Sequence, residues 1–89
     1  MRIPVPGLRV ASRVIDGQAL LLDPGRDELQ RLNEVGSFLW GLIKEKRHDV
    51  EALRLALAQA FEVSPSVANT DLQDFLNELE ARGLIVYRG

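Results

Sequence analysis

Residues 29–43 read LQRLNEVGSFLWGLI, and this stretch contains the junction between a predicted strand and a predicted helix. Asn33 stands at the junction. An asparagine side chain can accept hydrogen bonds from the unpaired amides of the first helical turn, and Glu34 suits the positive end of the helix dipole. We therefore predict that a helix begins just after Asn33 and that residues 29–32 before it form a short strand.

The predicted helix is covered on more than one side, because its apolar residues spread over about half of its circumference. Trp40 lies at one margin of this arc, and we expect it to be buried between the helix and the sheet or the C-terminal arm. Gly36 lies inside the arc, where a glycine lets another backbone come close at a helix-propensity cost of about 1 kcal/mol. The apolar residues of the arc are Val35, Phe38, Leu39, Trp40, Leu42 and Ile43.

Two further strands are predicted upstream of residue 29. Residues 8–15 place Leu and Val between arginines, and residues 18–22 contain ALLL. Asp16-Gly17 between them favours a two-residue hairpin turn, and Asp23-Pro24-Gly25 favours a second turn. Residues 1–7 contain two prolines, which indicates an extended, irregular tail.

Two more helices are predicted downstream. Asp49 suits the N-cap of the second helix. Ser64 and Pro65 suit the cap and first position of the third, and Gly83 suits its end. Residues 84–87 are apolar and β-branched, which predicts a terminal strand or extended arm that packs back on the core.

The predicted order of elements defines the fold class. A small antiparallel three-stranded sheet followed by three helices is an α+β arrangement, similar to the winged helix-turn-helix in a rearranged order. At 89 residues the chain makes one domain, which we assign to residues 8–89, with residues 1–7 as the N-terminal extended tail. A fold plan does not by itself define a function.

Composition excludes several classes of site. The chain has no cysteine and one histidine, so we expect neither a disulfide nor a metal site. His48 lies in a charged loop without a nucleophile nearby, which favours a solvated loop residue over a catalytic base. The glycines are scattered and form no phosphate loop. We therefore expect no enzyme and no cofactor.

The sequence also contains no signal peptide and no apolar run long enough to span a membrane, so a cytoplasmic protein that binds no membrane is expected.

A winged-helix DNA-binding transcriptional regulator is the alternative suggested by the helical plan. The third predicted helix would read the DNA, but from Ser64 to Arg82 it carries four acids and one arginine. Such a helix is repelled by dense phosphate charge. The net charge of −2 also does not favour nucleic acid as a partner.

A peptide-binding module remains. If residues 29–32 form a sheet edge, their unpaired backbone groups offer a template for an incoming extended peptide. Asp71, Asp74 and Glu78 follow helical spacing beside Phe75 on the third helix. This stripe has two interpretations: it only keeps the surface solvated, or it borders the peptide groove and favours a basic peptide.

The stretch RLNEVGSFLWGLI resembles the PqqD family, which contains leader-peptide-binding recognition elements of pathways that modify ribosomally made precursor peptides. Leu32, Asn33 and Glu34 match the Leu-Asn-Glu of the family pattern, Trp40 matches the aromatic residue of the following helix, and ALLLD at 19–23 matches its second strand. The resemblance covers about residues 8–86. This chain departs from the family at KEKRHD after the first helix and at Gly36, where alanine is common. The downstream matches are Asp71, Leu72, Phe75, Leu76, Leu79, Gly83 and Leu84.

The resemblance implies a non-catalytic carrier that holds the leader of a precursor peptide and presents it to a modifying enzyme. That enzyme is a radical S-adenosylmethionine (radical SAM) enzyme or a leader protease. An open sheet edge is compatible with a monomer or a weak strand-exchanged dimer. We predict that the leader adds as a strand, with either flank of the third helix as the other wall of the groove. The predicted peptide-binding residues are Leu29, Gln30, Arg31, Leu32, Asp71, Asp74, Phe75 and Glu78.

Overall fold

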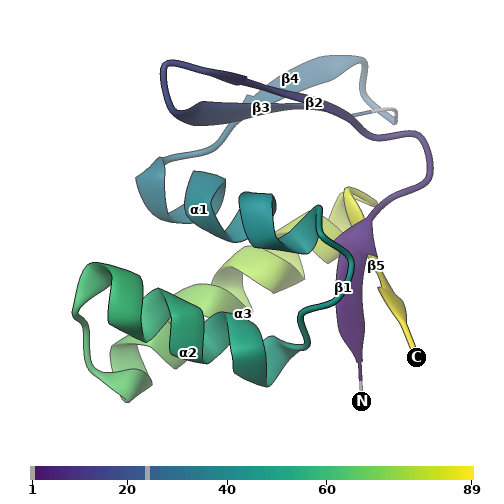
Figure 1. Ribbon diagram of the computed structural model, residues 1–89. Helices are drawn as coiled ribbons and strands as arrows, with labels where there is room; N and C mark the ends of the chain where they lie inside the picture. Colours follow the sequence, from purple (N-terminus) through teal and green to yellow (C-terminus); the bar gives the residue numbers. More distant parts are fainter. Residues whose placement is uncertain (1, 24) are drawn as a thin grey trace.

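A computed structural model of the chain describes residues 2–23 and 25–89, and it has the predicted α+β arrangement. The three-stranded sheet lies over one side of α1 (Figure 1). The other two helices, α2 and α3, lie on the opposite side of α1, and a separate strand pair stands at one end. The elements are β1 (Ile3–Pro6), β2 (Ala11–Ile15), β3 (Gln18–Asp23), β4 (Glu28–Arg31), α1 (Glu34–Ile43), α2 (Val50–Phe61), α3 (Pro65–Ala81) and β5 (Ile85–Arg88).

The sheet β2–β3–β4 is antiparallel, with β3 in the centre. The predicted hairpin turn is confirmed, since Asp16 and Gly17 have φ of 53° and 80°. The first strand begins at Ala11 rather than Leu8, which is fully exposed in the preceding loop. Of the second predicted turn, Pro24 lies outside the described residues, and the Asp27 amide donates to the Asp23 carbonyl at 2.9 Å.

The expectation of an irregular N-terminal tail is wrong for residues 3–6, which form β1 and pair antiparallel with β5. The Gly7 amide donates to the Leu84 carbonyl at 2.9 Å, so alternate residues before it also point their amides at β5. Pro4 and Pro6, which have no backbone N–H, occupy the positions whose nitrogens point away from β5, so no hydrogen bond of the ladder is lost. The two prolines are therefore compatible with an edge strand.

The predicted helix caps are confirmed. Asn33 Oδ1 accepts from the Gly36 amide at 2.8 Å, Asp49 Oδ1 accepts from the Ala52 amide at 2.8 Å, and Ser64 Oγ accepts from the Val67 amide at 3.3 Å. α3 ends at Ala81, and Gly83 follows its C-cap residue, as predicted, with a φ of 74° that few other residues adopt readily. Local sequence therefore determines where these helices begin and where α3 ends.

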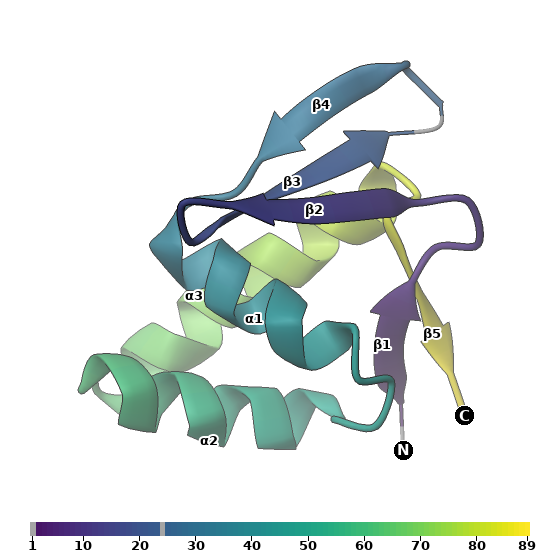
Figure 2. The same cartoon turned by 45° about the horizontal axis from the view of Figure 1, so that its top comes forward.

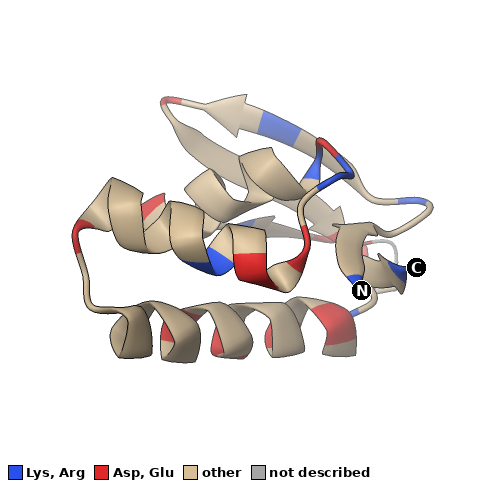
Figure 3. Ribbon diagram, turned by 60° about the horizontal axis from the view of Figure 1, so that its bottom comes forward, with Lys and Arg blue, Asp and Glu red and all other residues tan. Residues whose placement is uncertain are grey.

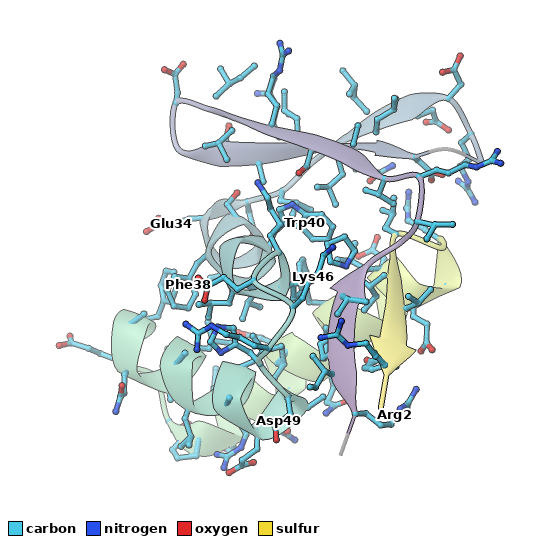
Figure 4. All side chains as sticks on the ribbon, turned by 45° about the vertical axis from the view of Figure 1, so that its right-hand side comes forward. Arg2, Glu34, Phe38, Trp40, Lys46 and Asp49 are labelled. Atoms are coloured by element: carbon cyan, nitrogen blue, oxygen red, sulfur yellow. The ribbon has the colours of Figure 1, made fainter. Side chains whose placement is uncertain are left out.

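The core lies between the sheet, the three helices and β5. Trp40 is buried as predicted, with 1% of its surface exposed, and Figure 4 shows it on the side of α1 toward the sheet and β1. Phe38, at the other margin of α1, packs edge-on against Phe61 of α2 with ring centroids 5.5 Å apart. None of the helices that the structure describes is long and apolar enough to cross a membrane.

Candidate functional site

The edge of the sheet at β4 presents backbone groups that no neighbouring strand uses. The Leu32 amide donates to the Ala19 carbonyl of β3 at 2.9 Å. Because backbone groups alternate in direction along a strand, Gln30 also faces β3, while Leu29 and Arg31 point their N–H and C=O groups away from it. Figure 2 shows β4 as an outermost strand of the sheet. The open template therefore consists of the backbones of Leu29 and Arg31.

A groove of about 170 Å³ separates this edge from α3. One wall comes from β4 and the start of α1, and the other comes from one side of α3. An added strand would thus have a cavity beside it for the side chains that point toward the helices. The residues that line the groove are Gln30, Arg31, Leu32, Asn33, Gly36, Phe75, Glu78, Leu79 and Arg82.

Gly36 and Phe75 shape the groove where it meets α1. An alanine Cβ at position 36 would lie 3.0 Å from Cε1 of Phe75, which is tighter than an ordinary contact. The absence of a side chain at Gly36 therefore leaves room for the Phe75 ring. Beyond this point a second hollow of about 260 Å³ continues along α3; its lining is Asn33, Val35, Gly36, Asp71, Asp74 and Phe75.

Ser37 fixes the end of the open edge, and the sequence pattern gave no indication of this role. Its Oγ accepts from the Ala19 amide at 2.8 Å and donates to the Leu32 carbonyl at 3.2 Å. One hydroxyl thereby joins α1 to the last residues of the β3–β4 ladder. This junction holds the template at a fixed place relative to the helix.

The charges around the groove are unevenly distributed. Glu78 forms an ion pair with Arg82 at 3.3 Å, so its charge is partly balanced at this end of the groove. Asp71 and Asp74 are exposed in the second hollow, where no lysine or arginine lines the wall. Figure 3 shows acidic positions recurring along α3. One end of the site is therefore mixed in charge, and the other is acidic.

The predicted site residues take different places around the edge. Gln30, Arg31 and Leu32 line the groove from β4, and Phe75 and Glu78 line it from α3, while Asp71 and Asp74 line the adjoining hollow. The side chain of Leu29 lies on the opposite face of the sheet, paired with Leu22, so only its backbone faces the edge. The role of all eight residues in peptide binding stays a prediction. Arg82 and Leu79, which are not among the predicted peptide-binding residues, complete the wall.

His48 lies away from this site. Its Nε2 is 2.8 Å from Glu45 Oε1, and this hydrogen bond is the main reason why the pKa of Glu45 is lowered. Among residues 2–23 and 25–89, no three His, Asp or Glu side chains are close enough to hold a metal ion. The geometry of the site is that of an open sheet edge beside a groove.

Comparisons with known proteins agree with this description. The model of the family described as coenzyme PQQ synthesis protein D (PqqD) matches residues 18–85. The structure of TbiB1 in complex with the TbiA(beta) leader peptide is similar to this chain, with a TM-score of 0.83 and 28% identity. The match covers 91% of this chain and 93% of that chain. No curated protein matches the sequence.

Proposed function

The chain belongs to the PqqD family, and we propose that it binds the leader of a ribosomally made precursor peptide as an added strand along β4. The observation that carries this proposal is the open β4 edge beside the groove of α3. The similar fold of TbiB1, a protein solved with a leader peptide bound, supports the same conclusion.

Backbone hydrogen bonds and side-chain contacts would both contribute to the free energy of leader binding. Leu29 and Arg31 offer two N–H and two C=O groups, and each hydrogen bond contributes about 0.5–1.5 kcal/mol, so together they supply about 2–6 kcal/mol. Micromolar binding requires about 8 kcal/mol. The groove must therefore supply the rest, through apolar leader side chains packed against Phe75 and Leu79.

We propose that the domain acts as a carrier without chemistry of its own. Its partner would be the enzyme that modifies the precursor, either a radical SAM enzyme or a leader protease. Holding the leader raises the concentration of substrate near that enzyme. We place this exchange in the cytoplasm and expect a monomer or a weak strand-exchanged dimer.

The winged-helix DNA-binding alternative has no support from the family match or from the charge of α3. The exposed side chains of that helix include Asp71, Asp74, Glu78 and Glu80, which would face phosphate in a reading helix.

A titration of isotope-labelled protein tests strand addition directly. The ligand is the leader of a small precursor, to be sought among the genes that neighbour this chain's gene, and the readout is the chemical shift of each backbone amide. We expect the largest changes at residues 29–32 and along α3 from Asp71 to Arg82. Strand addition is wrong if the largest changes fall in residues 44–48 and α2 while residues 29–32 stay silent.

A further inference from the structure

A hollow of about 310 Å³ lies between the end of α1 and the loop that leads into β2. The central strand β3 separates β2 from β4, and no residue lines both this hollow and the groove beside β4. The two are therefore distinct places on the protein. We call this one the lysine hollow; its walls include Leu8, Val10, Ser12, Trp40, Lys44 and Lys46.

Trp40 brings to the lysine hollow a hydrogen-bond donor that the fold does not use. The residue is 1% exposed, and its indole Nε1 has no acceptor among the residues that the structure describes. Figure 4 shows Trp40 on the side of α1 toward the sheet and β1, which is the side of the hollow. A buried N–H without an acceptor destabilises a fold. The donor is explained if an acceptor enters through the hollow.

Two lysines make the hollow positively charged. Lys44 and Lys46 are exposed, and neither forms an ion pair within the part of the chain that the structure describes. No acidic side chain lines the hollow. The helix dipole accounts for basic residues after the end of α1, but it does not account for the unpaired indole donor beside them. The charge and the donor together suit an anion.

The backbone at Lys46 holds one of these lysines in place. Its φ of 61° lies in a region that glycine and asparagine adopt more readily than lysine. The Lys46 amide donates to the Ile43 carbonyl at 3.0 Å, and the Lys46 carbonyl accepts a hydrogen bond from the guanidinium of Arg88 on β5. These bonds stabilise a turn that is unfavourable for lysine. An unfavourable backbone conformation of this kind is typical of a functional position.

The remaining walls define the kind of anion. Leu8, Val10 and the ring of Trp40 are apolar, and Ser12 adds a hydroxyl. Arginine, which binds phosphate through two parallel hydrogen bonds, is absent from the lining. The hollow therefore fits a carboxylate attached to an apolar group better than it fits a free phosphate.

We propose that the lysine hollow is a second ligand site, which binds a carboxylate carried on an apolar group. Lys44 and Lys46 supply the opposite charge, and the indole N–H of Trp40 donates to a carboxylate oxygen. The C-terminus of a peptide, an acidic side chain beside an apolar residue and a small apolar acid all present this chemistry. Binding here does not use the β4 edge, so the site goes beyond leader binding.

Trp40 reports on the site directly, because it is the only tryptophan of the chain. Its indole N–H gives one resonance in a nitrogen–proton correlation spectrum of isotope-labelled protein. The probe is N-acetyl-L-leucine at constant ionic strength. N-acetyl-L-leucinamide is the uncharged control, and inorganic phosphate is the anion without an apolar group. We expect the indole resonance to move downfield and saturate with the acid, and to stay in place with the other two.

Three variants each remove one contact. Lys44→Gln and Lys46→Asn remove a charge, the second with a residue that tolerates positive φ. Trp40→Phe removes the donor and keeps an aromatic ring in the core. Arg13→Gln on β2 is the matched control, because Arg13 is also an exposed cation without an ion pair among the described residues.

Backbone amide shifts give the affinity of every variant, including the one that lacks the indole. We expect each single variant at a lysine or at Trp40 to weaken binding of N-acetyl-L-leucine about threefold or more, and the double lysine variant about tenfold or more. The Arg13 variant should bind as the original chain does. The lysine variants should keep the original melting temperature, so they test the site even if the Trp40 variant folds poorly.

Four results overturn the proposal: an indole resonance that N-acetyl-L-leucine does not move, equal binding of the uncharged amide, tighter binding of phosphate, and lysine variants that bind as the original does. Two short peptides of the same apolar composition then identify the source of the carboxylate. One ends in a free carboxylate, and the other has an amidated end and an internal glutamate. Tighter binding of the first supports a peptide C-terminus and of the second an acidic side chain, whereas binding of N-acetyl-L-leucine without either peptide supports a small acid.

Discussion

The sheet has two open edges, at β4 and at β2, and of the two only the β4 edge faces a groove that α3 lines on the other side. Both edges present unpaired backbone groups, which are equally able to accept a strand of any sequence. At β4 the side chains of an incoming strand would meet Phe75 and Leu79 across the groove. At β2 the inward-facing Val14 is 62% exposed, so a strand added there would find little to pack against.

The difference shows what converts an edge into a site. Backbone pairing provides a template at both places, but a template of about four hydrogen bonds is too weak to hold a peptide alone. α3 supplies the second wall at β4, whereas the hollow beside β2 is lined by the loop before β2, by Trp40 of α1 and by the lysines after α1. Selectivity for one edge therefore comes from the helix and not from the strand.

The largest expected effect is unfolding of the whole domain, which removes both sheet edges at once. Trp40→Ala empties a buried site under the sheet, and such truncations cost about 3–5 kcal/mol, a large part of the stability of a small domain. Circular dichroism should show a mostly unfolded chain. Leu55→Ala, at a residue 51% exposed on α2, is the control and should melt as the original does. A cooperative melt of the Trp40 variant near the original temperature would contradict the role of Trp40 as a core residue.

The next effect separates the two edges. Arg31→Pro removes an outward amide at β4 and places a ring against the incoming strand, so leader affinity should fall at least tenfold, about 1.4 kcal/mol. Val14→Pro removes the corresponding outward amide at β2, because Ile15 and Arg13 face β3 when the hairpin closes at Ile15 and Gln18. This variant should bind leader normally. Anisotropy titrations of both variants measure the difference.

Gln30→Pro completes the set of proline variants. The Gln30 amide faces β3, so its removal breaks a hydrogen bond inside the sheet. This variant should melt earlier than Arg31→Pro. Equal leader affinity for the Arg31 and Val14 variants would show that β4 is not the docking edge.

A smaller effect tests the groove without touching the strand. Gly36→Ala sets a methyl group 3.0 Å from Phe75 and should displace the ring, lowering leader affinity by about threefold to tenfold, or 0.7–1.4 kcal/mol. The helix-propensity gain of about 1 kcal/mol should offset the crowding in stability. Gly41→Ala is the matched control, because a Cβ there meets nothing within 4 Å. If both variants bind the leader with the same affinity, the shape of the groove at Gly36 does not affect leader binding.

The smallest effect concerns charge at the groove. Asp71→Lys/Asp74→Lys reverses the acidic end, so a leader with lysine or arginine should associate several-fold more slowly at low salt. The difference should shrink as the screening length falls from about 30 Å at 0.01 M to about 3 Å at 1 M salt. Stopped-flow rates measure it, with Glu51→Lys/Glu62→Lys on and after α2 as the control. Association rates that do not depend on salt would show that the acidic stripe on α3 only keeps the surface soluble.

Local signals in the sequence predicted the elements well. The caps at Asn33, Asp49 and Ser64 and the turn at Asp16-Gly17 each depend on a few neighbouring residues, and the structure confirms all of them. β1 was missed because its partner β5 comes from the other end of the chain, and prolines normally argue against pairing. Pairing between distant segments leaves no local pattern to read.

The site was harder to predict than the fold for the same reason. The sequence placed a possible edge at residues 29–32, but the direction of each backbone group depends on the register with β3. The register places the side chain of Leu29 on the face of the sheet that points away from the helices, and the amide of Arg31 on the open edge. Arg82 lies past the end of α3 and reaches the groove only because the helix runs beside β4.

The pairing of β1 with β5 has a consequence for protein engineering and for gene fusion. Ile3 lies opposite Arg88, so the two ends of the chain leave the fold side by side (Figure 1). They leave at the strand pair, away from the β4 edge. Adjacent ends make a domain easy to append to, or insert into, another polypeptide. A linker attached at either end would leave the β4 edge clear.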